Sequence, residues 1–194
     1  ITDNNNQTIS SGTFTDVKSD DWFSGAIEFV HKKNLMKGVS DNEFAPNENL
    51  SRAMIVTILY RMENEPSASF NKFGDVNADE WYSAAVAWAS ANGIVNGVSE
   101  NEFAPNDNLT REQMAAIIYR YIKFKGKDVS VGENTNILSY TDAESVSEYA
   151  VEAICYAVGS GLMKGDSETT LNPSGTATRA ETATIIMRLF GIME

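Results

Sequence analysis

The sequence predicts a mainly all-α protein, in which three helix–loop–helix repeats pack as one pseudo-threefold bundle with the first helix of each repeat outside. Three observations support this fold class. One block of residues recurs three times along the chain, each copy holds two stretches with the apolar spacing of a helix, and the second stretch of each copy starts with a helix-capping residue.

The repeated block begins with an aromatic residue followed two positions later by an acid. Phe14 and Phe73 are 59 residues apart, and the same offset relates Trp22 to Trp81, Gly38 to Gly97, Pro46 to Pro105 and Arg52 to Arg111. A third copy opens at Tyr140 and carries Asp142, Gly165, Pro173 and Arg179 at the corresponding places. We therefore expect a linker at residues 1–13, and repeats at 14–63, 73–124 and 140–192 that form one structural unit.

The first half of each repeat is expected to form a helix. In the first copy the apolar stripe is formed by Trp22, Ala26, Ile27 and Val30. Gly38, Gly97 and Gly165 follow the periodic stretch, where a left-handed residue commonly closes a helix. Proline and asparagine come next and predict a loop.

The second half of each repeat has its own helix start. Thr110 with Gln113 and Thr178 with Glu181 both fit the capping box, whereas Ser51 keeps only the hydroxyl. Four apolar columns follow at i, i+3, i+4 and i+7, and each stripe needs its equivalents to cover it. The columns are Ile55/Met114/Thr182, Ile58/Ile117/Ile185, Leu59/Ile118/Ile186 and Met62/Tyr121/Leu189. Linkers are expected at residues 64–72 and 123–139, the second as a flexible insertion.

Composition excludes several classes of function. The 194 residues carry a formal net charge of −12, which disfavours nucleic acid and anionic membrane surfaces as partners. No apolar run approaches the ~20 residues that span a bilayer. Cys155 is the only cysteine and His31 the only histidine, so neither an intrachain disulfide nor a multi-histidine metal site can form. We expect no cofactor and no metal.

The sequence also argues against an enzyme. It contains neither a phosphate-binding P-loop nor the Gly-x-Ser-x-Gly motif of serine hydrolases. A glycosidase needs one acid/base pair of carboxylates, which three near-equivalent repeats do not naturally create. We therefore expect a non-catalytic module, monomeric in solution.

The repeats resemble the S-layer homology family over residues 14–191. The resemblance is carried by the aromatic-x-Asp start, by the Gly-[IVL]-x-x-Gly turns at 93–97 and 161–165, and by the Thr-Arg-Ala-Glu helix start at 178–181. It implies a three-pronged unit that attaches secreted surface proteins to the bacterial cell wall. The implied ligand is a secondary cell-wall polysaccharide that carries pyruvylated N-acetylmannosamine, held in grooves between adjacent repeats.

The resemblance also implies candidate ligand-binding residues. The family's ligand-contacting arginine corresponds most closely to Arg179, then to Arg111, and least to Arg52, whose motif departs at two positions. A helix N-terminus with free N–H groups and an arginine fork would suit the pyruvyl carboxylate. The other candidates are Asp16, Asp75 and Asp142 for sugar hydroxyls, Trp22, Trp81 and Tyr149 for the sugar ring, and the turn residues Gly38, Gly97 and Gly165.

Structural interpretations stand beside these. Each arginine could be a solvated side chain, the tryptophans could belong to the core, and the aspartates could cap a helix or turn. Arg61, Arg120 and Arg188 also recur, late in the second helix, where interaction with the helix dipole would suffice. The alternative function is a surface module that self-associates or binds a protein partner.

Overall fold

The computed structural model describes residues 13–68 and 72–194, so nearly all of the predicted N-terminal linker lies outside the described residues. Within them the chain forms six α-helices and three short 3-10 helices, with no strand longer than an isolated bridge. The α-helices are α1 (Ser24–Lys32), α2 (Arg52–Met62), α3 (Ser83–Ala91), α4 (Arg111–Phe124), α5 (Val151–Gly159) and α6 (Arg179–Met193). The mainly all-α class is confirmed.

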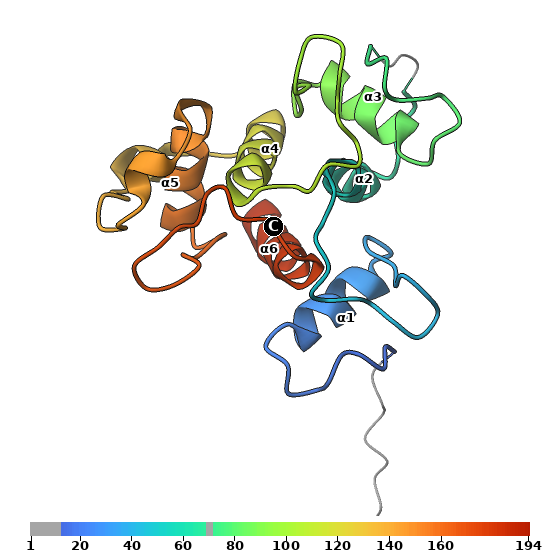
Figure 1. Cartoon of the computed structure of the whole chain (residues 1–194), viewed down its shortest axis with the longest axis horizontal. Coiled ribbons are helices and arrows are strands. Elements are labelled where there is room, and N and C mark those ends of the chain that lie inside the picture. The colour runs from blue at the N-terminus through green and yellow to red at the C-terminus, as the bar shows by residue number, and fades with distance from the viewer. Residues whose placement is uncertain (1–12, 69–71) are drawn as a thin grey trace, which may run out of the picture.

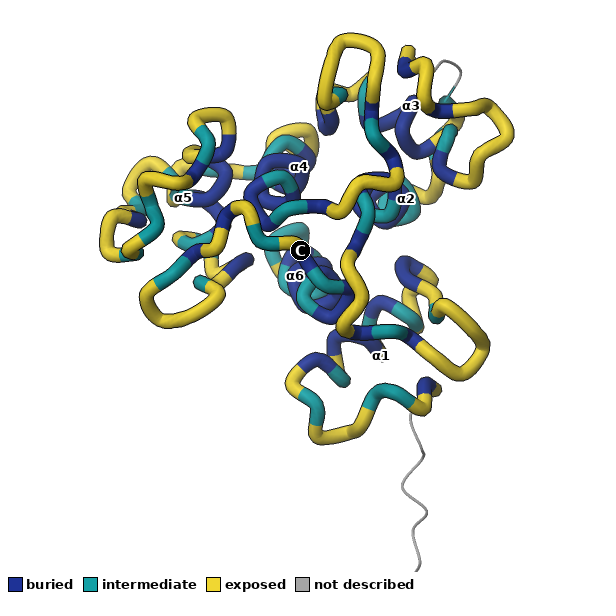
Figure 2. The backbone as a smooth tube through the Cα atoms, viewed as in Figure 1, coloured by how far each residue is buried: buried dark blue, intermediate teal, exposed yellow. Residues whose placement is uncertain are grey.

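The second helices of the three repeats lie at the centre of the molecule. Figure 1 shows α2, α4 and α6 together in the middle, with α1, α3 and α5 around them. The predicted apolar columns on these helices are buried, apart from the half-buried Met62. In Figure 2 the central helices are largely buried and the loops around the outer helices are largely exposed. A rotation axis relating the repeats stays a prediction.

Each outer helix packs against a central helix of a different repeat. The helix pairs in contact are α2 with α3, α4 with α5, and α6 with α1. In the last pair the ring centroids of Phe29 and Phe190 lie 5.2 Å apart. This pair joins the two ends of the described chain. Because no repeat buries its own first helix, each depends on a neighbour for its core.

A ring of three backbone hydrogen bonds joins the repeats where the central helices begin. The N–H of Leu50 donates to Ala177 O (2.8 Å), that of Ala177 to Leu109 O (2.9 Å), and that of Leu109 back to Leu50 O (2.8 Å). The three residues occupy equivalent places in the repeats, immediately before the helix caps. The ring therefore sets the starting point of all three central helices.

The central helices start as the sequence predicts. Capping boxes are present at Thr110 with Gln113 and at Thr178 with Glu181, and the Ser51 hydroxyl accepts the N–H of Met54.

The outer helices differ from the prediction at both ends. α1 begins two residues after Trp22, with no side-chain cap. It ends at Lys32. The left-handed residue that follows it is Asn34 (φ 56°), and not Gly38 as predicted. In the other repeats this role falls to Gly93 and Gly161.

Gly38, Gly97 and Gly165 are required for a different reason, which is space. A Cβ on Gly97 would meet the backbone oxygens of Ser99 and Glu102 and the ring of Phe73. Equivalent atoms surround the other two glycines. The turn can close only because a side chain is missing there.

The predicted flexible insertion at 123–139 is packed. α4 extends to Phe124, and a 3-10 helix at Ser130–Asn134 lies against α5. Gly132 approaches the backbone of Tyr156, where an added Cβ would lie 3.1 Å from its N and Cα atoms. The prediction missed this because its polar and glycine-rich composition is also that of a free linker.

Two glycine-to-alanine substitutions should have opposite effects on stability. Gly97→Ala should lower the free energy of unfolding by about 2 kcal/mol or more, because rigid backbone oxygens oppose the new methyl group. Gly25→Ala, inside α1 with nothing within 4 Å of the added Cβ, should raise it by about 0.5–1 kcal/mol. Urea unfolding of both variants measures this, and a stable Gly97→Ala variant would contradict the packing argument.

Candidate ligand-binding grooves

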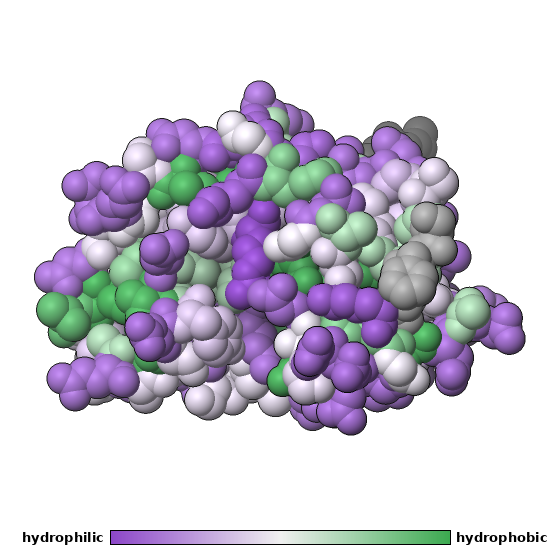
Figure 3. Space-filling view, turned by 90° about the horizontal axis from the view of Figure 1, so that it is seen from above, coloured by the Kyte–Doolittle hydropathy of each residue, from purple (hydrophilic) through white to green (hydrophobic). Residues whose placement is uncertain are grey.

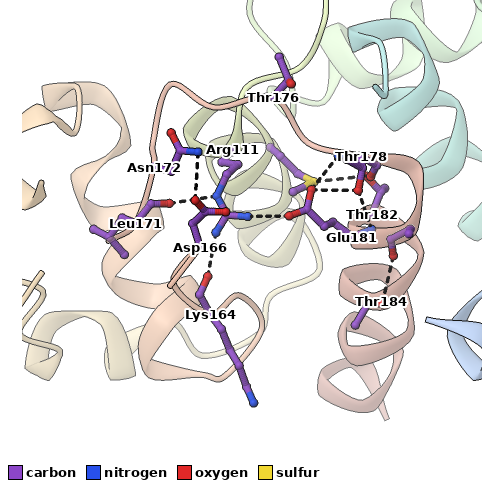
Figure 4. A network of polar contacts seen from close by, with 12 residues as sticks. Arg111, Lys164, Asp166, Leu171, Asn172, Thr176, Thr178, Glu181, Thr182 and Thr184 are labelled. Carbon is purple, nitrogen blue, oxygen red and sulfur yellow. Dashed lines mark hydrogen bonds and ion pairs between the residues drawn. The ribbon is translucent and has the colours of Figure 1, made fainter. Parts of the chain in front are cut away.

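The three arginines that begin the central helices are buried, each with 6% of its surface exposed. Arg179 donates from Nε to Phe44 O and from Nη2 to Lys37 O, both at 2.8 Å. Arg52 makes the same pair of bonds to Phe103 O and Asn96 O, and Arg111 to Leu171 O and Lys164 O. Figure 4 shows Arg111 reaching across to these loop carbonyls. Each arginine thus links its helix to the loop of another repeat.

Burial affects the guanidinium groups without removing their charge. It lowers the pKa of Arg52 and Arg179, but both side chains stay protonated at neutral pH. Arg179 also lies over the ring of Phe44, 4.5 Å from its centroid. Its Nη1 bonds to none of the described residues. Since His31 Nδ1 is the single buried unpaired side-chain atom among those residues, Nη1 retains contact with solvent.

Asp16, Asp75 and Asp142 support the loops that the arginines reach. Asp75 accepts the N–H of Phe103 at 2.9 Å and that of Ala104 at 2.7 Å, and the other two make equivalent pairs. Ala104 has a φ of 56°, which is unfavourable for a residue with a side chain. Both oxygens of each carboxylate are therefore used to hold a strained loop, and neither caps an outer helix.

The N–H groups at the start of the central helices are not free. In α2 the N–H of Arg52 donates to Asp107 O (3.0 Å) and that of Ala53 to Pro105 O (2.9 Å), while Ser51 caps the third. The same pattern repeats at the starts of α4 and α6. The expectation that exposed N–H groups would receive a carboxylate is wrong, because the neighbouring loop already occupies them.

The aromatic candidates are exposed, unlike the arginines and aspartates. Trp22, Trp81 and Tyr149 have 67%, 58% and 53% of their surface exposed. A core role, which the sequence left open for the tryptophans, does not fit these values. Each aromatic residue precedes an outer helix and stands beside the central helix on which that outer helix packs.

The Trp81 groove is a hollow of about 200 Å³ between the Gly38 turn, α2 and the indole. Its cations are Lys37, Arg61 and Arg179, and none of its lining residues is acidic. Arg61 donates from Nη1 to Leu35 O at 2.9 Å, which holds its guanidinium against the turn. The groove therefore combines a flat apolar face with local positive charge on a protein whose net charge is −12.

The Trp22 groove has the equivalent lining at the other end of the chain. It measures about 230 Å³ and contains Arg111, Lys164 and Arg188 beside the Gly165 turn. Glu181 also lines it and contacts Nη1 of Arg111 at 3.3 Å, as Figure 4 shows. The equivalent residue in the Trp81 groove is Met54, so the Trp22 groove carries one negative charge more.

The third aromatic residue has a different environment. The Tyr149 hydroxyl donates to Glu112 at 3.1 Å, and Tyr149 lines a hollow that also contains Arg120. Burial and the Glu112 carboxylate raise the pKa of Tyr149 to about 12, against the opposing effect of Arg120 and Arg52.

Sequence reasoning missed some of the groove cations. Arg61 and Arg188 had been noticed as recurring, but were attributed to the helix dipole. Each follows the first arginine of its helix by nine residues, which is half a turn around the axis, so the two arginines of one helix face different grooves. Lys37 and Lys164 precede the turn glycines and could have been found by comparing the repeats.

The surface of the module is mixed in character. Figure 3 shows one face on which hydrophilic side chains alternate with smaller apolar patches. No group of three or more acidic, histidine or cysteine side chains in the described part of the chain could hold a metal ion. None of the helices in the described ranges is long and apolar enough to cross a membrane.

Comparison with known proteins identifies the repeats. The family model of the S-layer homology domain matches residues 13–53, 72–115 and 139–183. The chain is 32% identical over 185 residues to an amylopullulanase of Thermoanaerobacterium thermosulfurigenes, which covers 94% of this chain and 10% of that protein. It is 33% identical over 167 residues to the surface-layer 125 kDa protein of Lysinibacillus sphaericus, covering 84% of this chain and 14% of that protein.

The relatives are much longer than this chain. The S-layer protein sap of Bacillus anthracis is 28% identical over 179 residues, which covers 91% of this chain and 21% of that protein. The part shared with enzymes and with surface-layer proteins is the same, so it is the module that anchors surface proteins to the cell wall. With all three repeats matched, this chain belongs to the S-layer homology domain family and is a wall-anchoring module of a secreted protein.

Proposed function

We propose that this chain binds a secondary cell-wall polysaccharide that carries pyruvylated N-acetylmannosamine, chiefly in the Trp81 groove and also in the Trp22 groove. The observation that carries the proposal is the pairing of an exposed indole with a cluster of cations in each groove. A sugar ring can lie against the indole face while its ketal carboxylate meets the cations.

In the Trp81 groove, Arg179 contributes one N–H to the ligand and not a fork. In Arg179 the Nε and Nη2 groups are bonded to loop carbonyls, which leaves Nη1 for the carboxylate. Arg61 and Lys37 supply the remaining positive charge at the Trp81 groove. Because the loop carbonyls hold the guanidinium in place, little side-chain freedom is lost when the ligand binds.

The aspartates and turn glycines support the ligand site indirectly. Asp16 shapes the loop whose carbonyl receives Arg179, and Gly38 lets the turn approach that loop. Two grooves on one module also favour retention on a repeating polymer, because the polymer is released only when it dissociates from both grooves at the same time.

Calorimetric titration with purified wall polysaccharide should show binding that is lost after mild acid removes the pyruvyl ketals. The reason is that the carboxylate is the group that the groove cations recognise. Undiminished binding to the acid-treated polymer would contradict the carboxylate contact. If neither form binds while the chain oligomerises with concentration, the module instead binds protein partners.

Substitutions in the Trp81 groove should weaken binding with little effect on folding. Trp81→Ala and Arg61→Ala should each weaken binding of a monovalent probe at this groove about tenfold, with a small change in melting temperature, since the indole is exposed and Arg61 half-buried. Leu138→Ala, at an exposed residue outside both grooves, is the control. Equal loss of affinity in the control would refute the assignment.

Arg179→Ala should differ by reducing stability as well as binding. It leaves two loop carbonyls without their charged donor, which should lower the free energy of unfolding by about 3 kcal/mol. Arg179→Lys should not restore stability, because a single ammonium group cannot reproduce the two bonds. Urea unfolding checks both variants, and a fully stable Arg179→Ala protein would show that these bonds contribute nothing.

Met54→Glu should make the Trp81 groove resemble the Trp22 groove. The new carboxylate would stand where Glu181 stands beside Arg111, and should weaken binding of the pyruvylated probe about fivefold to tenfold. Met54→Gln serves as the uncharged control. Calorimetry with the methyl glycoside of pyruvylated N-acetylmannosamine measures the difference, and equal affinities of the two variants would refute the charge argument.

A further inference from the structure

We propose that the third groove, beside Tyr149, is closed to carboxylated ligands by the chain's own Glu112, so that the module binds with two grooves and not three. This inference rests on the proposed function and concerns one side chain that distinguishes the third groove from the other two.

Glu112 is the second residue of α4 and is buried, with 8% of its surface exposed. Its carboxylate accepts three hydrogen bonds from the segment before α5. The donors are the N–H of Ser147 (2.9 Å), the hydroxyl of Ser147 (2.8 Å) and the hydroxyl of Tyr149 (3.1 Å). The carboxylate is therefore held in one place by the same segment that carries the groove's aromatic residue.

The equivalent residues in the other repeats are Ala53 and Ala180, which have no charge to place there. The aromatic residues differ as well, because the indoles of Trp22 and Trp81 have no hydroxyl that could donate a hydrogen bond to a carboxylate. One extra residue between Asp142 and Tyr149, relative to the other repeats, brings Ser147 into the segment that contacts Glu112. All three changes occur at the same groove.

The hollow at Tyr149 contains Arg120 and Lys123, and its cations are placed differently from those of the other two grooves. Asn96 stands where the other grooves have Lys37 and Lys164. Arg120 makes no hydrogen bond with the described residues, whereas Arg61 and Arg188 donate to the turn carbonyls of Leu35 and Leu162. Arg52 and Arg120 both act electrostatically on the Tyr149 hydroxyl, so the Glu112 carboxylate shares their surroundings.

A ligand carboxylate entering this groove would meet a fixed like charge. Two carboxylates that share one small site cannot both be ionised without a large cost in free energy. Glu112 also cannot move aside without losing its three hydrogen-bond donors. Glu112 thus places a fixed negative charge at the aromatic residue of this groove, which excludes a carboxylated ligand by charge repulsion.

The number of ligands bound per chain tests the inference. The probe is the methyl glycoside of pyruvylated N-acetylmannosamine, which can fill only one groove at a time. We expect calorimetry to give two sites for the unchanged chain and three for Glu112→Ala, the residue that the other repeats already carry at this position. An unchanged number of sites in a folded Glu112→Ala variant would overturn the inference.

A second design does not depend on how well Glu112→Ala folds. Trp22→Ala combined with Trp81→Ala removes two exposed rings and leaves the third groove unchanged, so the affinity of the two open grooves should fall about tenfold. Adding Glu112→Gln, which keeps the side chain's size, should then add one site of higher affinity than these two. A site of unreduced affinity in the double variant would show that the third groove is open and would overturn the inference.

The two proposals fail in different ways. If the unchanged chain binds no probe, the proposed function is lost and this inference with it. If it binds the probe at three sites, the proposed function stands and only the closure by Glu112 is refuted. A purely structural Glu112 would alter the melting temperature of the variants but not the number of sites.

Discussion

The fold depends on hydrogen bonds that cross from one repeat to the next. Leu50, Leu109 and Ala177 exchange backbone bonds in a closed ring, and immediately after them each central helix directs its first N–H groups and its arginine to a neighbouring loop. A helix start normally leaves several donors unsatisfied. Here those donors bond to a neighbouring repeat, so each repeat depends on another for the start of its central helix.

This constraint also bears on the proposed ligand sites. The loop carbonyls accept hydrogen bonds from the first N–H groups of each central helix and from Nε and Nη2 of its arginine. The remaining polar groups therefore lie at the side of the helix start. The exposed indoles, the second arginine of each central helix and the turn lysines surround that place. In the proposed function, structure and recognition share Arg179, whose Nε and Nη2 bond to loop carbonyls while Nη1 is left for the ligand.

Near-equivalent repeats can carry unequal sites. The Trp81 and Trp22 grooves differ by Met54 against Glu181, and the third site differs by Glu112 and Tyr149. None of these changes disturbs the apolar columns or the backbone ring. Single residues next to the helix start can consequently tune each groove while the fold stays the same.

The sequence by itself determined the fold class, the three repeats, the helix caps at Thr110 and Thr178, and the buried columns, because apolar periodicity and local capping are properties of neighbouring residues. Only the tertiary structure decided that α1 packs on α6, that Arg179 bonds to Phe44 and Lys37, and that Asp16 braces a loop. These contacts join residues far apart in the chain, and no local pattern encodes which repeat supplies the partner. Trp81 and Arg179 looked alike as candidates, and their opposite exposure followed from packing alone.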